Sequence, residues 1–518
     1  MRFCSGEMRK CCFFACAAKP TLGRMKPPSD SVMPSCEAPA VNAAAILPGL
    51  DPSRWRRNAT LGILTSGVFM AVLDTTVVNV ALNAMRASLH SSVAELAWIV
   101  DAYSLAFAAF ILTGGLLTDR IGARTVFLAG MAVFIAASAA CGLAPSVVAL
   151  IAARIVQGVG AAMFLPSSLS LVRATFDDPR ERAWAIGLWG GIVACAAAVG
   201  PALGGWLVDA YGWRSAFLIN VPLGVAGMAG TWVIVRHAQP ARARPFDWAG
   251  QATSVVMLAA LCFVAIEWPV RGAQSPWVWG AALLTAVAVA LFVIAERRAR
   301  APLVPLAWFA HRTLGAVNGV GFLLNFGYFG ALFVLSLHLQ NVEHFSARQT
   351  GLVLLPLAVS LSAGNLFAGK LMARVPMPDM MVGGLLIGGA GLLATSMALG
   401  AHAPIWLACV ATVAFGGGTA LAIAPMTSSI LAAVPGELAG TASGLLNAAR
   451  QTGSLLGVAV AGAIITVVPD VARALPTAFA VMAVSYAGAV ATAFFFFCLL
   501  LLVVSFSSYL TFSCLYYF

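Results

Sequence analysis

The chain has 518 residues, of which 61% are hydrophobic and only 9% are charged, and its formal net charge is +11. Soluble globular domains carry about 25% charged residues, so the composition excludes that class and indicates a protein whose solvent is the lipid bilayer. The basic excess does not indicate nucleic-acid binding. The basic residues gather in alternate loops between apolar segments and never form one patch with interleaved aromatic side chains.

Residues 1–57 precede the first apolar segment and are predicted to form a disordered cytoplasmic tail that ends in Arg54, Arg56 and Arg57. The tail has no apolar run followed by a small-residue cleavage site, so a cleaved signal peptide is not expected. An alternative is that translation starts at Met25 or Met33. The cysteines of the tail have no histidine at ligand spacing, so no metal site is expected there.

Fourteen apolar segments follow the tail, and each is long enough to cross a bilayer as a helix. They span residues 59–82, 94–117, 125–144, 147–171, 184–208, 216–235, 249–268, 277–295, 314–339, 349–372, 380–400, 404–430, 438–467 and 477–502. The predicted fold class is therefore an all-α integral membrane protein with fourteen transmembrane helices. Residues 506–518 form an atypical apolar C-terminus, to which no function is assigned.

Basic residues are distributed unequally between the two sides of the membrane. One side collects Arg120, Arg124, Arg173, Arg180, Arg182, Arg236, Arg242, Arg244, Arg297, Arg298, Arg300, Arg312, Lys370 and Arg374, and the other holds Arg86, Arg214, Arg271, Arg348 and Arg473. Because the cytoplasmic loops of membrane proteins carry the excess of basic residues, both termini are predicted to be cytoplasmic. The expected location is the cytoplasmic (inner) membrane, as a multi-pass protein in contact with lipid.

An internal repeat organises these segments. Gly115, Leu117 and Arg120 recur as Gly369, Leu371 and Arg374, and two further sets recur at nearly the same separation of about 255 residues: Gly158, Pro166 and Ser170 as Gly417, Pro425 and Ser429, and Gly187 and Gly200 as Gly444 and Gly457. Such a repeat indicates two halves in the same orientation. The predicted units are an N-terminal six-helix half (58–236), two inserted helices (237–300) and a C-terminal six-helix half (301–505).

Polar side chains interrupt the first apolar segment. Asp74, Thr75 and Asn79 lie inside it, and Asp74 is roughly 20 Å into the bilayer at 1.5 Å per residue from Leu61. Polar groups at this depth cost several kcal/mol unless they are partnered or hydrated, so they are candidates for a transport pathway. The alternative is that Asp74 only forms a structural pair with an arginine.

Asp101 and Arg154 lie at the same level as Asp74. Asp101 is roughly 27 Å from the hinge at Asp119, and Arg154 is roughly 28 Å from the same membrane face. A buried guanidinium requires compensation, and a nearby carboxylate would supply it. The alternatives are that Asp101 is shallow enough to be hydrated and that Arg154 forms a purely structural ion pair.

A short charged hinge joins the second and third apolar segments: Gly115, Asp119, Arg120, Gly122 and Arg124. Its spacing, G-x-L-x-D-R-x-G-x-R, resembles the loop between helices 2 and 3 of the major facilitator superfamily, although Ala123 stands where that pattern usually has a basic residue. The resemblance implies that the loop abuts helix 13, near Leu438, when the cytoplasmic side is closed. Asp119 would then be a latch for the outward-open state, with Arg120 and Arg124 holding it in place.

The fifth segment contains Gly200, Pro201, Gly204 and Gly205. Small residues at this spacing let another helix approach closely, and proline bends the segment. The sequence G-P-x-x-G-G is similar to the helix 5 motif of antiporters. Together with residues 73–82, 213–224 and 440–453, the last of which includes Arg450, it resembles the 14-helix drug:proton antiporter branch of the superfamily.

The resemblance implies a proton-coupled antiporter that exports lipophilic, cationic drugs or toxic compounds and needs no cofactor beyond the proton gradient. It associates Arg154 with proton transfer and Asp101 with organic cations, and it places Asp74, Thr75, Asn79 and Arg450 along the proton and substrate pathway. A periplasmic adaptor and an outer-membrane channel are conceivable partners. Aromatic residues of the ninth segment, among them Phe322 and Tyr328, are candidates for a cavity lining.

Two other functions compete with this interpretation. One is a dedicated exporter of a single metabolite, antibiotic or siderophore, and the other is a membrane-embedded enzyme. Membrane-embedded enzymes usually gather His, Asp or Glu on one face, whereas the six histidines here lie at helix ends or in loops. The sequence contains no P-loop, so ATP is not expected to drive transport.

Overall fold

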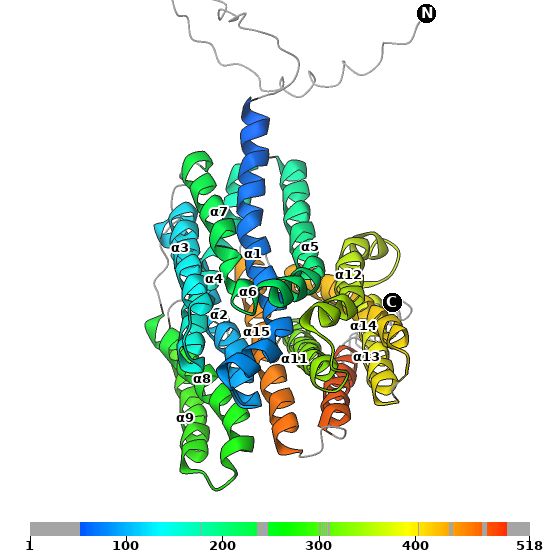
Figure 1. The fold of residues 1–518 in the computed structure, drawn as a ribbon. Coiled ribbons are helices and arrows are strands. Elements are labelled where there is room, and N and C mark those ends of the chain that lie inside the picture. Colours follow the sequence, from blue (N-terminus) through cyan, green and yellow to red (C-terminus); the bar gives the residue numbers. More distant parts are fainter. Residues whose placement is uncertain are drawn as a thin grey trace, which may run out of the picture. The chain divides into compact units, whose positions relative to one another are not determined.

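The computed structural model describes residues 52–176, 178–235, 247–299, 311–401, 403–434, 439–468 and 474–494, with a few residues between 302 and 308. Most of the expected cytoplasmic tail, the apolar stretch 506–518, Arg236, Arg242, Arg244, Arg300, Arg473 and Leu438 lie outside the described residues. Throughout the described part of the chain, the secondary structure is helical, with turns and short connections between the helices (Figure 1).

Fourteen helices in the described residues are long and apolar enough to cross a membrane, as predicted. The helices are α1 (Pro52–Leu89), α2 (Val93–Ile121), α3 (Ala123–Gly142), α4 (Val147–Thr175), α5 (Pro179–Tyr211), α6 (Ser215–Leu218), α7 (Asn220–Ile234), α8 (Trp248–Arg271), α9 (Pro276–Arg298), α11 (Arg312–Asn341), α12 (Ala347–Leu371), α13 (Met377–Gly400), α14 (Ile405–Ala432) and α15 (Ala439–Val467). Short α6 and α7 together form one span, Ser215–Ile234, and the last span is Ala474–Phe494.

Local sequence signals set several helix starts at the membrane surface. Ser92 and Glu95 form a capping box at the start of α2, and Ser346 and Gln349 form another at the start of α12. Each serine hydroxyl accepts a hydrogen bond from a backbone N–H that has no partner in the helix, and the third residue returns the bond. Asp247 caps α8 in the same way, by accepting from the N–H of Gly250 at 2.8 Å.

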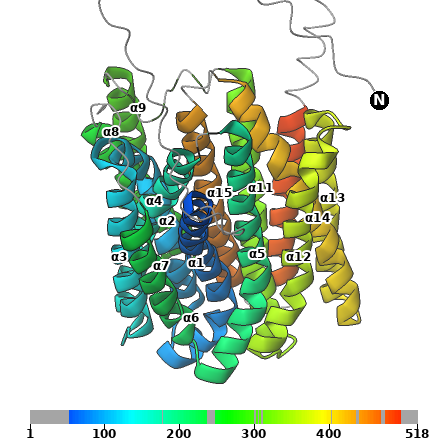
Figure 2. The same cartoon turned by 90° about the horizontal axis from the view of Figure 1, so that it is seen from above.

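The helices form two bundles. In one bundle, α4 packs against α2 and α3, and α1 packs against α5 and α7, while in the other α14 packs against α12 and α13, and α11 packs against α15. The largest contacts between the bundles are those of α2 with α15 and of α5 with α12, and α1 also contacts α11 and α12. The inserted helices α8 and α9 pack against each other, and α8 also contacts both α2 and α15 (Figures 1 and 2).

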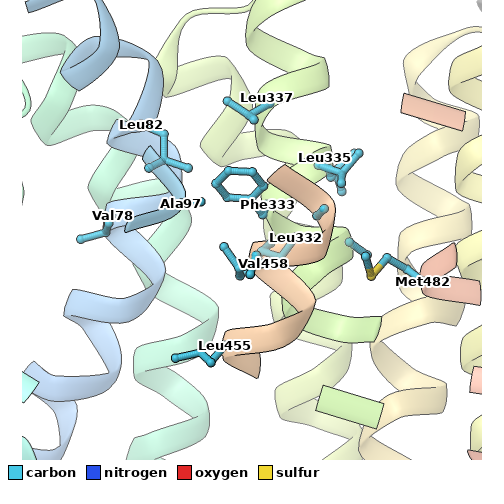
Figure 3. Packing of buried hydrophobic residues seen from close by; sticks show 14 of the residues in the cluster. Val78, Leu82, Ala97, Leu332, Phe333, Leu335, Leu337, Leu455, Val458 and Met482 are labelled. Carbon is cyan, nitrogen blue, oxygen red and sulfur yellow. The ribbon is translucent and has the colours of Figure 1, made fainter. Parts of the chain in front are cut away.

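A continuous apolar core crosses from one bundle to the other. Figure 3 shows Val78 of α1 and Ala97 of α2 on one side, and Phe333 of α11 and Val458 of α15 on the other. All four side chains are 0% to 1% exposed. The bundles are therefore held together partly by close apolar packing, which in a bilayer depends on van der Waals contact more than on exclusion of water.

Candidate functional site

A buried ion pair lies in the N-terminal bundle. Arg154 of α4 donates from Nη1 to Oδ2 of Asp74 of α1 at 2.5 Å, and the two side chains are 1% and 0% exposed. The pair joins two residues that sequence reasoning had placed at one depth. Arg154 also donates from Nε to the carbonyl of Ile99 on α2 at 3.1 Å, so one guanidinium connects α1, α2 and α4.

Three residues that were not predicted as site residues complete this network. Gln157 accepts from Arg154 at 2.7 Å and donates to Oδ1 of Asp74 at 2.9 Å, and Asn220 of α7 donates to the same oxygen at 2.9 Å. Ser138 of α3 accepts from both amides, at 3.1 Å from Gln157 and 3.0 Å from Asn220. The Asp74 carboxylate therefore accepts from three donors on two other helices, which fix its position.

An aromatic side chain closes one side of the pair. The guanidinium carbon of Arg154 lies 4.4 Å from the ring centre of Tyr103, a residue of α2 that is 3% exposed. A cation over a ring face gains more when both are shielded from water.

The signal for Gln157, Asn220 and Ser138 in the sequence is the placement of polar residues inside apolar spans, which requires an internal partner.

Asp101 lies in a different environment from Asp74. It is 0% exposed, and neither carboxylate oxygen has a hydrogen-bond partner. Cys262 of α8 lies within electrostatic range of it, whereas Arg154 contacts this part of α2 at the carbonyl of Ile99 and the ring of Tyr103. Asp101 is therefore not the hydrated surface group that a shallow position would allow. It is a buried carboxylate without a counter-charge.

Thr75 and Asn79 do not join the ion-pair network. The hydroxyl of Thr75 donates to the carbonyl of Val72 at 2.8 Å, and the side chain of Asn79 donates to the carbonyl of Thr75 at 2.8 Å. The backbone carbonyl of Asn79 instead accepts from Ser336 of α11 at 2.5 Å. Around Asn79, α1 thus contributes to the contact between the two bundles.

The hinge residues divide into a packed group and an exposed group. Gly122 ends α2 with φ of 95°, a conformation that favours glycine, and its N–H donates to the carbonyl of Thr118 at 3.1 Å. Arg124 is 9% exposed and donates to the carbonyl of Trp232 on α7 at 2.7 Å. Asp119 and Arg120 are exposed.

Two neighbouring glycines of the hinge differ in their packing. A side chain at Gly115 would meet nothing within 4 Å, while one at Gly114 would collide with the backbone of Ala162 on α4. Gly114, which sequence reasoning did not single out, therefore lets α2 approach α4. The start of α15, where the hinge is expected to dock, lies outside the residues whose side chains are described.

The glycines of the fifth segment bring α5 against two helices. A side chain at Gly200 would collide with Thr76, and one at Gly204 would lie 2.8 Å from Val77, both on α1. One at Gly205 would collide with the backbone of Ala347 on α12, where Gly351 in turn packs on the carbonyl of Pro201. The motif therefore acts as a packing surface shared by α1, α5 and α12.

The α5–α12 pair is in contact from the membrane face opposite the hinge through the middle of the span. At that face, Oδ2 of Asp209 on α5 accepts from Ser346 at 2.8 Å and from the backbone of Arg348 at 3.1 Å. Deeper in the span, Ser362 of α12 donates to the carbonyl of Ala194 on α5 at 2.5 Å, and a side chain at Gly191 would lie 3.9 Å from Leu366. Nearer the hinge face, side chains at Gly187 and Gly190 of α5 would meet nothing within 4 Å.

The C-terminal bundle has an aromatic interior. Tyr486 is 1% exposed, its hydroxyl lies 2.7 Å from that of Thr419, and its ring lies 5.8 Å from that of Phe415. Tyr328 packs on the other side of Phe415 at 5.6 Å, so at least one aromatic of the ninth span belongs to the core. Arg450 of α15 lies near Gly321 of α11, and its Nε is buried without a hydrogen-bond partner.

No metal site is present in the described ranges, where no three His, Cys, Asp or Glu side chains come close enough to hold an ion. The buried charged groups that the described part of the chain brings together are instead the Asp74–Arg154 pair and its amide partners.

Comparison with known proteins identifies one family. Residues 64–458 match the Major Facilitator Superfamily. The chain is 40% identical to a methylenomycin A resistance protein of Streptomyces coelicolor, over 80% of this chain and 88% of that protein. It is 36% identical to the multidrug resistance protein Stp of Mycobacterium tuberculosis, over 79% and 77%, and 38% identical to a tetracenomycin C resistance and export protein of Streptomyces glaucescens, over 79% and 76%.

A solved structure has a similar fold. The crystal structure of a bacterial homolog of the human lysosomal transporter Spinster, described as inward-facing and unoccupied, aligns with a TM-score of 0.61 and 19% identity. The alignment covers 86% of this chain and 98% of that one.

Proposed function

The chain belongs to the major facilitator superfamily, and we propose that it is an antiporter that exports lipophilic drugs or toxic compounds in exchange for protons. It is a transport protein and not an enzyme, as its family and its relatives of the resistance and efflux type establish. The names of those relatives, which refer to resistance or export, support the direction of transport.

One observation carries the proposal of proton coupling. Asp74 and Arg154 form a pair that is closed to solvent and joins two helices inside the membrane span. A shift of α1 relative to α4 within the bundle would separate the two groups and expose the carboxylate to the cavity, where it could exchange a proton. A drug that enters the opened site would complete an exchange of proton for drug.

The orientation in the membrane forms part of the proposal. The basic residues described at the hinge face, such as Arg120, Arg124 and Arg312, support a cytoplasmic position for that face, with both termini inside and the protein in the cytoplasmic membrane. With this orientation, Asp209 closes the α5–α12 pair on the outer side, and Gly187 and Gly190 leave open space beside α5 toward the cytoplasm. A closed outer side supports a state that receives drug from inside the cell.

Reconstitution into proteoliposomes tests the coupling. With ethidium as the transported dye, we expect accumulation that requires an imposed pH gradient, is abolished by a protonophore and is unaffected by ATP. Asp74→Asn should remove at least about 90% of the gradient-driven transport while the protein still inserts, because the amide keeps the shape but binds no proton. Transport driven by ATP in the absence of any gradient would contradict the proposal.

A dedicated exporter of one antibiotic is the second candidate. It is favoured by the names of two relatives, each of which refers to a single compound, methylenomycin A or tetracenomycin C. Susceptibility of an efflux-deficient strain to a panel of unrelated drugs separates the two. Resistance to several classes supports a multidrug exporter, and resistance to one compound supports the dedicated one. A requirement for a periplasmic adaptor and an outer-membrane channel is tested by the same panel in strains that lack such partners.

A further inference from the structure

Arg450 is a buried cation without a counter-charge. It lies 11 residues after the start of α15 at Ala439, roughly 16 Å along the helix and so within the membrane span. Its residue is only half-buried, but its Nε is fully covered and has no hydrogen-bond partner. The ion pairs found in the described part of the chain involve other residues.

An acceptor without a donor lies on the neighbouring helix. Asn318 of α11 is 3% exposed, and its Nδ2 donates to the carbonyl of Leu314 at 2.7 Å. Its Oδ1 is buried and has no partner. A buried amide oxygen without a donor costs about 1–3 kcal/mol, so the unpaired Oδ1 of Asn318 and the unpaired Nε of Arg450 both require an explanation.

The packing of α11 on α15 brings these groups to one level. A side chain at Gly321 would lie 3.3 Å from Cγ of Arg450, and Asn318 is one turn before Gly321 on α11. Side chains on a helix lean toward its N-terminus, so the Arg450 guanidinium extends from that contact toward the turn that carries Asn318. One turn further on, Gly453 packs on the backbone of Phe322, and there the helices touch and leave no room between them.

Arg154 shows how this chain stabilises a guanidinium that belongs to the folded core. That residue has a carboxylate, an amide and a backbone carbonyl as acceptors. Among the described residues Arg450 has no acceptor of this kind at its buried Nε, and its side chain is half-exposed. The guanidinium is therefore within reach of a ligand that brings its own acceptor, and such a ligand would remove the cost of the unpaired Nε.

We propose that Arg450 and Asn318 form a subsite for a carboxylate or phenolate group carried by the exported compound. The planar guanidinium would pair with the two oxygens of a carboxylate, and Asn318 would accept from a hydroxyl or protonated acid on the same ligand. This inference rests on the proposed export function and extends its substrates from lipophilic cations to lipophilic acids and zwitterions. The aromatic residues of the C-terminal bundle would contact the apolar body of such a compound.

A matched pair of dyes tests the inference. Rhodamine 110 carries a free carboxylate, and rhodamine 123 is its methyl ester, so the two differ in the group that Arg450 would bind. In proteoliposomes with a pH gradient, we expect wild-type protein to transport both. Arg450→Gln should lower transport of the acid at least about tenfold more than transport of the ester, since one charge-assisted bond is lost for the acid only. In Arg450→Lys, the loss of acid transport relative to ester transport should lie between those of the wild type and Arg450→Gln. Asn318→Ala should lower transport of the acid less than Arg450→Gln does.

Thr452→Ala is the matched control on the same helix, because the Thr452 hydroxyl bonds only to its own helix, at the carbonyl of Ala448. Fluorescence polarisation of each dye with purified protein gives a second readout, in which affinity for rhodamine 110 should fall in Arg450→Gln. Gel filtration of each variant shows whether it is folded, and if Arg450→Gln is not, Arg450→Lys and Asn318→Ala carry the test.

The outcomes separate this inference from the proposed function. If the wild type transports neither dye and no ethidium, the export proposal fails. Transport of ethidium and rhodamine 123 without rhodamine 110 would overturn the subsite alone. Equal loss of both dyes in a folded Arg450→Gln protein would also overturn it and assign Arg450 to coupling. Transport of the ester that depends on chloride, and loses that dependence in Arg450→Gln, would show that a free anion occupies the position.

Discussion

The buried arginines of the two bundles differ in their hydrogen-bond partners. In the N-terminal bundle, Arg154 and Asp74 pair with each other and have further partners. Arg154 donates to the carbonyl of Ile99, and Asp74 accepts from Gln157 and Asn220. In the C-terminal bundle, the Nε of Arg450 on α15 and the Oδ1 of Asn318 on α11 are both buried without a hydrogen-bond partner. A repeat that duplicated the helix packing therefore did not duplicate the polar interior. The difference suggests a division of tasks, with proton exchange in one half and ligand selection in the other.

The largest expected effect tests whether Arg154 and Arg450 contribute differently to the stability of the protein. Arg154→Gln leaves the Asp74 carboxylate buried without its counter-charge, which typically costs about 3–5 kcal/mol. Arg450→Gln removes a charge that has no partner and should cost less than about 1 kcal/mol or raise stability. The midpoints of thermal unfolding of both variants in detergent show which substitution lowers stability more. Equal losses would mean that Arg450 also has a structural partner and that the contrast between the bundles is wrong.

A second prediction concerns the packing that the repeat did duplicate. Gly200 of α5 lies against Thr76 of α1, and its repeat partner Gly457 of α15 lies against the backbone carbonyl of Phe326 on α11. An added methyl forces the helices apart in both places, with a typical cost of about 1–3 kcal/mol. Gly457→Ala should be the more damaging change, because a backbone carbonyl moves less readily than the Thr76 side chain.

Gly187→Ala provides the control for this pair of variants, since a side chain there meets nothing within 4 Å. Alanine also favours a helix over glycine by about 1 kcal/mol. The midpoint of thermal unfolding should therefore stay unchanged or rise in Gly187→Ala and fall in the other two variants. A fall in all three would point to a general intolerance of substitution rather than to these contacts.

A third prediction uses Asp101, the exception within the N-terminal bundle. Asp101→Asn removes a carboxylate that has no internal partner, so the protein should remain as stable as the wild type. If Asp101 attracts cationic drugs, export of a divalent dye such as propidium should fall about fivefold more than export of monovalent ethidium, because a lost charge costs a doubly charged ligand more. Transport rates of the two dyes in one set of proteoliposomes measure this ratio. An equal loss for both would assign Asp101 to coupling.

Much of the fold could be predicted from the sequence for a simple physical reason. A span must be helical and about 20 residues long, because lipid supplies no hydrogen-bond partners to the backbone. The depths of Asp74 and Arg154 followed from counting residues, and their pairing followed from the cost of burying either one alone. The fourteen spans therefore lie close to the predicted segments.

The remaining parts of the site depend on helix rotation, which residue counting does not reveal. Asp101 has nearly the same depth as Arg154, but the face of α2 that carries it lies toward α8. Asn220 belongs to the site because the rotation of the α6–α7 span about its axis turns its amide toward Asp74. Likewise Gly114, rather than Gly115, packs on α4. These facts depend on which faces of several helices meet.

The smallest expected effect concerns the hinge between α2 and α3. Asp119 is exposed, although its neighbour Leu116 packs in one apolar cluster with Leu445 of α15. The apolar part of the hinge therefore already contacts the C-terminal bundle, and the charge of Asp119 is free to act on the same helix. When the face closes, the first turn of α15 presents backbone N–H groups with a partial positive charge, which a carboxylate stabilises by about 0.3–1 kcal/mol.

Asp119→Asn keeps the size of the side chain and removes its charge, so the closed hinge face loses that stabilisation while Arg124 remains anchored on α7. The ratio of the two states should shift by about a factor of two to five toward the state that is open at the hinge face. A single cysteine placed on α5 at position 190, where a side chain meets nothing within 4 Å, would report the shift in a background without other cysteines through its rate of labelling by a membrane-impermeant maleimide. We expect faster labelling than in the same background with Asp119. An unchanged rate would mean that Asp119 belongs to a solvated turn, and that the two bundles are held closed at this face by apolar contacts alone.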